Sequence, residues 1–122
     1  MRQSSANTRD SRGIDRVRPL VSAPVEIQIM GAGTLEVLTA HDISVSGLGI
    51  MVPHRFLGCE LDHEVKLIIT LPGIRPFWAT GIVRHSSADG VDDLFGVEFT
   101  KIEPPDLARI MRYVEARMAT DS

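Results

Sequence analysis

The sequence predicts a mainly β protein: a six-stranded antiparallel barrel with one C-terminal α-helix and a flexible N-terminal arm. Six short segments alternate apolar and polar residues, as strands with one buried face do. Turn residues separate these segments and no helical segment comes between them, which disfavours a parallel α/β fold. Only near the C-terminus does the apolar spacing change to that of a helix. A closed barrel leaves no exposed sheet edge, which favours it for so short a chain.

The arm is residues 1–19, which show no hydrophobic periodicity. Residues 1–18 contain five arginines and two aspartates, a net charge of +3, which leaves −6 on the rest of a chain whose total is −3. Charged termini are commonly disordered, so one interpretation is a solvated tail that only aids solubility. The alternative is an arm that holds a small, compact anion. Long nucleic acid is disfavoured as a partner, because phosphate contacts supply most of that affinity and the body is acidic.

The barrel and the helix together are expected to occupy residues 20–122. Two glycines in the segment 31–33 predict a tight turn after the first strand, since glycine tolerates positive φ. Pro72 and Gly73 end the fourth strand, and the aspartates near residue 90 mark a loop before the sixth. The six expected strands are residues 25–29, 35–43, 48–52, 65–71, 77–84 and 95–99.

The helix is predicted over about residues 104–119. Pro104, Pro105 and Asp106 suit its first turn, and Arg112 and Arg117 lie towards the end that favours cations. We expect its apolar stripe to cover an opening of the barrel. That stripe consists of Leu107, Ile110, Met111, Val114 and Met118.

Several classes of protein are disfavoured by what the sequence contains. A length of 122 residues predicts one domain, and the longest apolar run is far below the roughly 20 residues of a membrane helix. The N-terminus has no apolar central region typical of a secretory signal, so we expect a cytoplasmic protein. Cys59 is the only cysteine, which excludes an internal disulfide.

No enzyme, cofactor or metal is expected. The four histidines, His41, His54, His63 and His85, do not have zinc-like spacing, and there is no defensible nucleophile–base pair or phosphate-binding loop. We interpret His41 as an ordinary strand or surface histidine and Trp78 as a residue packed in the core or at the barrel rim.

Two stretches could carry a binding function, one around Arg12 and Arg16 and one at 42–47. Because residues i and i+2 of a strand share a face, Asp42 and Ser44 are expected to point outward while Ile43 points into the core. Ser46 and Gly47 then permit a sharp bend. A strand that simply ends in an Asx or serine turn is the alternative interpretation.

Taken together, these stretches resemble the PilZ family of cyclic di-GMP receptors. The family signature is Arg-x-x-x-Arg followed by Asp/Asn-x-Ser-x-x-Gly, which Arg12 and Arg16 and then Asp42, Ser44 and Gly47 match. The resemblance extends over residues 12–118 and includes the strands after Gly47 and at 96–99 and the terminal helix. Many relatives have the second arginine nearer the first strand, so Arg18 is an alternative to Arg16. Ser11 stands where many relatives have another arginine, which leaves the number of bound ligands open.

The resemblance implies a ligand with two guanines and two phosphates. Arginine can bind guanine O6 and N7, or phosphate oxygens, in bidentate fashion. Asp42 could accept from guanine N–H groups, Ser44 could donate to phosphate or pair with a base edge, and Gly47 would let the backbone approach the ligand.

The resemblance also implies an adaptor rather than a catalyst. The arm would close over cyclic di-GMP on the barrel and change a surface that an effector protein recognises, so as to regulate motility, exopolysaccharide output or surface attachment. A nucleotide-independent interaction module of the same fold is the main alternative. A barrel that binds single-stranded nucleic acid is a weaker one, since it needs a basic track and stacking aromatics.

Overall fold

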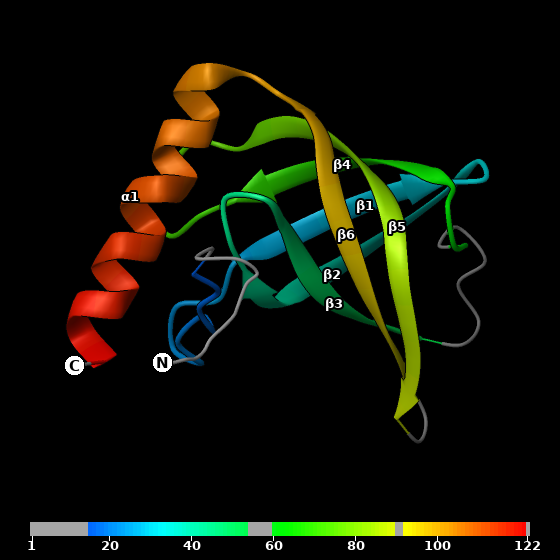
Figure 1. The fold of residues 1–122 in the computed structure, drawn as a ribbon, viewed down its shortest axis with the longest axis horizontal. Helices are drawn as coiled ribbons and strands as arrows, with labels where there is room; N and C mark the ends of the chain where they lie inside the picture. The colour runs from blue at the N-terminus through cyan, green and yellow to red at the C-terminus, as the bar shows by residue number, and fades with distance from the viewer. Residues whose placement is uncertain (1–14, 54–59, 90–91, 122) are drawn as a thin grey trace, which may run out of the picture.

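The computed structural model describes residues 15–53, 60–89 and 92–121, which form six strands and one helix (Figure 1). Arg12 and the rest of the arm up to residue 14 lie outside the described residues. The elements are β1 (Glu26–Gly31), β2 (Thr34–Ile43), β3 (Gly47–Pro53), β4 (Glu64–Thr70), β5 (Phe77–Asp89), β6 (Asp92–Ile102) and α1 (Pro104–Asp121).

The strands form a closed antiparallel barrel in the order β1-β2-β3-β6-β5-β4. Pairing between β1 and β4, with Ile27 opposite Ile69, closes the barrel. The predicted fold class is therefore confirmed, and each predicted strand lies where the alternation places it. In the described part of the chain, no helix is long and apolar enough to span a membrane.

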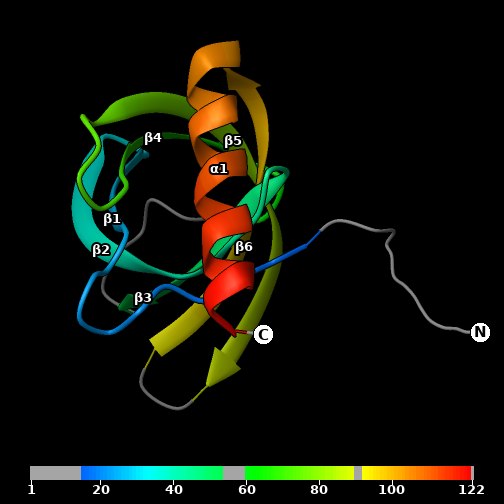
Figure 2. The same ribbon diagram turned by 90° about the vertical axis from the view of Figure 1, so that its left-hand side faces the viewer.

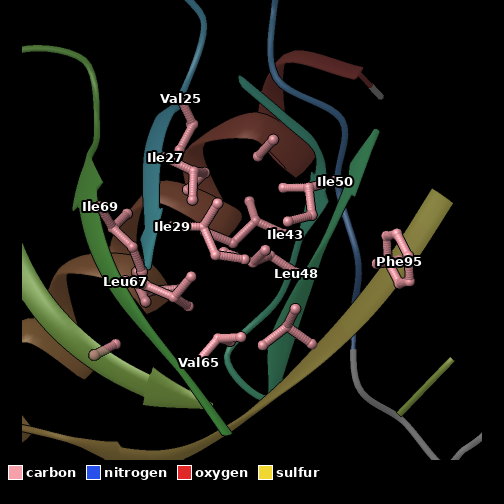
Figure 3. Close-up of a cluster of buried hydrophobic side chains, with 14 of the residues drawn as sticks. Val25, Ile27, Ile29, Ile43, Leu48, Ile50, Val65, Leu67, Ile69 and Phe95 are labelled. Carbon is pink, nitrogen blue, oxygen red and sulfur yellow. The ribbon is translucent and has the colours of Figure 1, made fainter. Parts of the chain in front are cut away.

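The barrel is filled by the apolar side chains of the alternating pattern. Ile27 and Ile29 of β1 point across the interior toward Ile43 and Leu48, and all four are fully buried (Figure 3). α1 lies across one end of the barrel (Figures 1 and 2) and buries Ile110 and Val114 there. The helix therefore covers an opening of the barrel as predicted, but two members of the predicted stripe, Met111 and Met118, face solvent at 46% and 41% exposed.

The hairpin of β5 and β6 is longer than predicted. β5 continues past Arg84 to Asp89, and β6 begins at Asp92, so most of the expected loop pairs as strand. Polar and exposed side chains such as His85 and Ser86 end the hydrophobic alternation while the backbone ladder continues. Trp78 was expected to pack in the core or rim, but 57% of it is exposed, because it points outward between the inward-facing Phe77 and Ala79.

The chain before β1 is attached to the barrel at Val17. The Val17 N–H donates to the Ile43 carbonyl at 3.0 Å, and the Ile43 N–H donates back to the Val17 carbonyl at 2.9 Å. The Val17 side chain is 6% exposed and belongs to the core. Residues beside Val17 are consequently held close to the end of β2.

We predict that alanine substitutions at a buried and at an exposed leucine have very different effects on the free energy of unfolding. Leu67→Ala removes a fully buried side chain of β4 and should lower the free energy of unfolding by about 2–5 kcal/mol. Leu61→Ala, at a position 52% exposed, should change it by less than about 0.5 kcal/mol. Urea denaturation followed by circular dichroism measures both values, and equal losses would contradict the described packing.

Candidate functional site

The two sequence motifs meet through Arg16 and Asp42, which are 26 residues apart in the chain. Arg16 Nη1 donates to Asp42 Oδ1 at 2.5 Å, and the side chains are 46% and 19% exposed. The structure therefore brings the second arginine of the first motif onto the first residue of the second motif. This ion pair is accessible to solvent on its arginine side.

Neighbouring residues position the Asp42 carboxylate. The ladder of β2 and β3 shifts register between Ala40 and Asp42, and His41 Nδ1 then donates to Asp42 Oδ2 at 3.0 Å. Gly49 lies opposite Asp42, and a Cβ atom there would come within 2.9 Å of the carboxylate oxygen. The carboxylate thus occupies space that only a glycine at position 49 leaves free.

Ser44 does not point outward as expected, because it is fully buried. Its N–H donates to the Gly47 carbonyl at 2.8 Å, and its hydroxyl donates to the same oxygen at 3.3 Å. The Ser46 N–H in turn donates to Ser44 Oγ at 3.2 Å, and the two hydroxyls lie 2.9 Å apart. Ser44 therefore holds the β2–β3 turn together and presents Ser46.

The space beside Gly47 is filled by β6. A Cβ atom on Gly47 would come 2.1 Å from the Val97 carbonyl oxygen, far inside contact distance. β6 also contacts the turn that precedes β3, where the Phe99 N–H donates to the Ser46 carbonyl at 2.8 Å. A glycine at this position is therefore required by the approach of β3 to β6.

Two hollows of about 390 and 510 Å³ adjoin Arg16 on the outer wall of the barrel. We call them the Arg16 hollows. Both are lined by Arg16, His85 and Gly96; the smaller adds Ser46, Arg84, Val97 and Glu98, and the larger adds Asp42, Gly49, Ser86, Leu94 and Phe95.

Sequence reasoning missed Ser46, Arg84 and His85 as members of this region. The polar run at the end of the fifth expected strand was the available signal for Arg84 and His85. Arg84 Nε donates to Glu98 Oε1 at 2.8 Å, and this hydrogen bond raises the pKa of the Arg84 guanidinium above its ordinary value. Arg84 therefore remains a cation at the edge of the smaller hollow.

Arg18, the alternative motif arginine, lies apart from this region. It lines a different hollow, together with residues such as Leu20 and Val37, and its carbonyl accepts from Arg117 Nε of α1 at 2.9 Å. Of these two arginines, Arg16 is the one that contacts Asp42.

The arrangement offers complementary groups for a polar, partly aromatic ligand. Arginine, serine and histidine side chains supply donors, Asp42 and Glu98 supply acceptors, and Leu94 with the small exposed part of Phe95 supplies apolar surface. Within the described ranges, no group of three or more histidine, cysteine, aspartate or glutamate side chains is placed to hold a metal ion.

Comparisons with known proteins agree with this architecture. Inhibitor of motility MotI/DgrA from Bacillus subtilis superposes with a TM-score of 0.77 at 20% identity, over 89% of this chain and 52% of that one. The PilZ domain of YcgR from Escherichia coli, solved with c-di-GMP, gives 0.74 at 13% identity over 92% and 95%. The MrkH–c-di-GMP complex of K. pneumonia gives 0.79 at 15% identity over 90% and 53%.

The chain thus spans about half the length of MotI and MrkH and nearly all of the YcgR domain. A search of curated protein sequences gave no match. The sequence model of the PilZ domain matches residues 9–116, which is most of the chain. From this match, the chain belongs to the PilZ domain family.

Proposed function

We propose that this protein is a cyclic di-GMP receptor whose ligand lies on the Arg16 hollows. The observation that carries the proposal is the contact between Arg16 and Asp42, which unites the two motifs beside hollows of adequate size. Family membership and the cyclic di-GMP complexes of YcgR and MrkH support this ligand. PilZ proteins are binding and regulatory proteins, not enzymes, and we assign no reaction to this chain.

Ligand binding would exchange partners within the Arg16–Asp42 pair. The Asp42 carboxylate can accept from the ring and exocyclic N–H groups of a guanine. Arg16 is then free to bind guanine O6 and N7, or two phosphate oxygens, in bidentate fashion. His41 keeps its hydrogen bond to Asp42 Oδ2, so the carboxylate stays in place during the exchange.

The serine–glycine part of the motif would act mainly by holding the turn. Ser44 and Gly47 fix the β2–β3 turn by hydrogen bonding and close approach, and Ser46 faces the smaller hollow. We therefore assign direct ligand contact to Ser46 rather than Ser44. Arg84 and His85 line the same hollow and add a cation and a ring for phosphate and base.

Arg12 and the part of the arm that precedes Val17 would close over the bound nucleotide. Fixing a residue costs about 1–2 kcal/mol of conformational entropy, which charge-assisted contacts from Arg12 and Arg16 must exceed. Because Val17 is already held by two hydrogen bonds to Ile43, the segment that closes is the one before Val17. Closure would change the surface presented to an effector protein in the cytoplasm, and so regulate motility, exopolysaccharide output or surface attachment.

Arg16→Ala should weaken cyclic di-GMP binding at least about tenfold, equivalent to about 1.4 kcal/mol, because it removes the charged donor beside Asp42. Arg18→Ala should change the dissociation constant less than about twofold, since Arg18 lines another hollow. Isothermal titration calorimetry measures both, with cyclic GMP as the control ligand. The same titration gives the number of nucleotides bound.

An absence of binding heat in the wild type, with no rise in its melting temperature, would contradict the receptor function. The protein would then be a nucleotide-independent interaction module of the same fold. A loss of nucleotide binding in Arg18→Ala alone would instead identify Arg18, rather than Arg16, as the second arginine of the motif.

A pair of serine variants tests the division of roles in the turn. Ser44→Ala should lower stability by about 1–3 kcal/mol, because it leaves buried polar groups without their partner. Ser46→Ala should change stability by less than about 0.5 kcal/mol and still weaken nucleotide binding. Thermal melts and calorimetric titrations measure the two effects, and a direct ligand role for Ser44 predicts the opposite order.

A further inference from the structure

A third hollow of about 700 Å³, larger than either Arg16 hollow, lies between the segment 18–24 and β2. We call it the β2 groove. Leu20 and Val21 line it from the N-terminal segment, and Val37 and Met51 line it from the barrel. Among these, Val21 is 99%, Val37 52% and Leu20 48% exposed. Apolar side chains from two distant parts of the chain therefore face water around one groove, as at many protein-binding sites.

The shape of the groove restricts what it can bind. The tight turn in which the Ala23 N–H donates to the Leu20 carbonyl at 3.1 Å raises Val21 at one wall. The described strands close into a barrel, so a partner finds no free sheet edge there and must bind through side chains. Exposed Glu26 and Arg18 also line the groove and provide one charge of each sign.

Two connections link the β2 groove to the Arg16 hollows. His41 lines the groove and donates to the Asp42 carboxylate at 3.0 Å. Along the N-terminal segment, Arg16 lines the hollows, Val17 is buried, and Arg18 lines the groove. A ligand that draws Arg16 away from Asp42 therefore acts on residues directly joined to both groove walls.

We propose that the β2 groove binds an extended segment of the effector protein, and that the nucleotide alters its affinity. The segment would place apolar side chains against Val21 and Val37, a basic side chain at Glu26 and an acidic side chain at Arg18. The nucleotide dependence rests on the function proposed above; the groove itself does not. A second copy of this chain is disfavoured, because a two-fold contact would set one concave surface against another.

The test uses a phage-displayed library of short random peptides, selected on the wild-type protein with and without cyclic di-GMP. A selected peptide is then synthesised with a fluorescent label, and its binding is measured by anisotropy. Val37→Glu should abolish binding, whereas Leu61→Glu should not, since both positions are 52% exposed but Leu61 lies outside the groove. Thermal melts of both variants check that they fold.

Saturating cyclic di-GMP should change the affinity of the peptide at least about fivefold, a typical coupling between linked sites. His41→Phe lacks the hydrogen bond to Asp42, so it should lose most of that change; its peptide affinity without nucleotide is measured alongside, because His41 also lines the groove. Calorimetry on the same samples shows whether the nucleotide binds. If the nucleotide does not bind the wild-type protein, the receptor function fails, while Val37→Glu still decides whether the groove binds the peptide.

Three outcomes would overturn the proposal. The first is that no peptide is enriched or that binding survives Val37→Glu. The second is a dimer in sedimentation equilibrium that Val37→Glu dissociates, because the groove would then bind a second copy. The third is a loss of cyclic di-GMP binding in Val37→Glu as large as in Arg16→Ala, which would make the groove part of the nucleotide site.

Discussion

Two backbone hydrogen bonds between Val17 and Ile43 position the Arg16 hollows and the β2 groove relative to each other. They hold the N-terminal segment across the end of β2, with the Val17 side chain in the core. Arg16 is thereby placed over Asp42 on one side, and the segment from Arg18 forms a wall of the β2 groove on the other. One short contact thus brings three parts of the molecule together: the end of the arm, the Asp-x-Ser-x-x-Gly motif and the apolar groove.

The Asp-x-Ser-x-x-Gly motif is largely explained by packing within the barrel. The Val97 carbonyl excludes any side chain at position 47, and Ser44 completes the hydrogen bonds of the turn. Gly49, just outside the motif, leaves room for the Asp42 carboxylate. A motif of this kind fixes the place and orientation of one carboxylate and one small turn. Under the proposed function, ligand recognition then depends on Asp42 and on side chains that other strands supply.

The fold could be predicted because each strand carries its own period-two pattern and the helix carries its own stripe. The site could be predicted only in part. Alternation says which residues face inward within a strand, but Ser44 lies where β2 ends in a turn, and local hydrogen bonds bury it. Arg84 and His85 join the site through pairing of β5 with β6, and Val17 joins the core through one bridge to β2. Such long-range contacts leave no local period in the sequence.

The Arg16–Asp42 pair also limits how much free energy the motif itself can contribute. Both groups already have a charged partner before ligand arrives, so binding replaces one ionic contact by two others and gains only the difference. Exposed ion pairs contribute little to stability on their own, so breaking the Arg16–Asp42 contact costs little free energy. Under the proposed function, further affinity comes from groups that the nucleotide newly contacts, such as Arg12 and His85. Under the proposed function, ligand binding and closure of the arm are parts of one equilibrium, so ligand affinity and the change of surface would vary together.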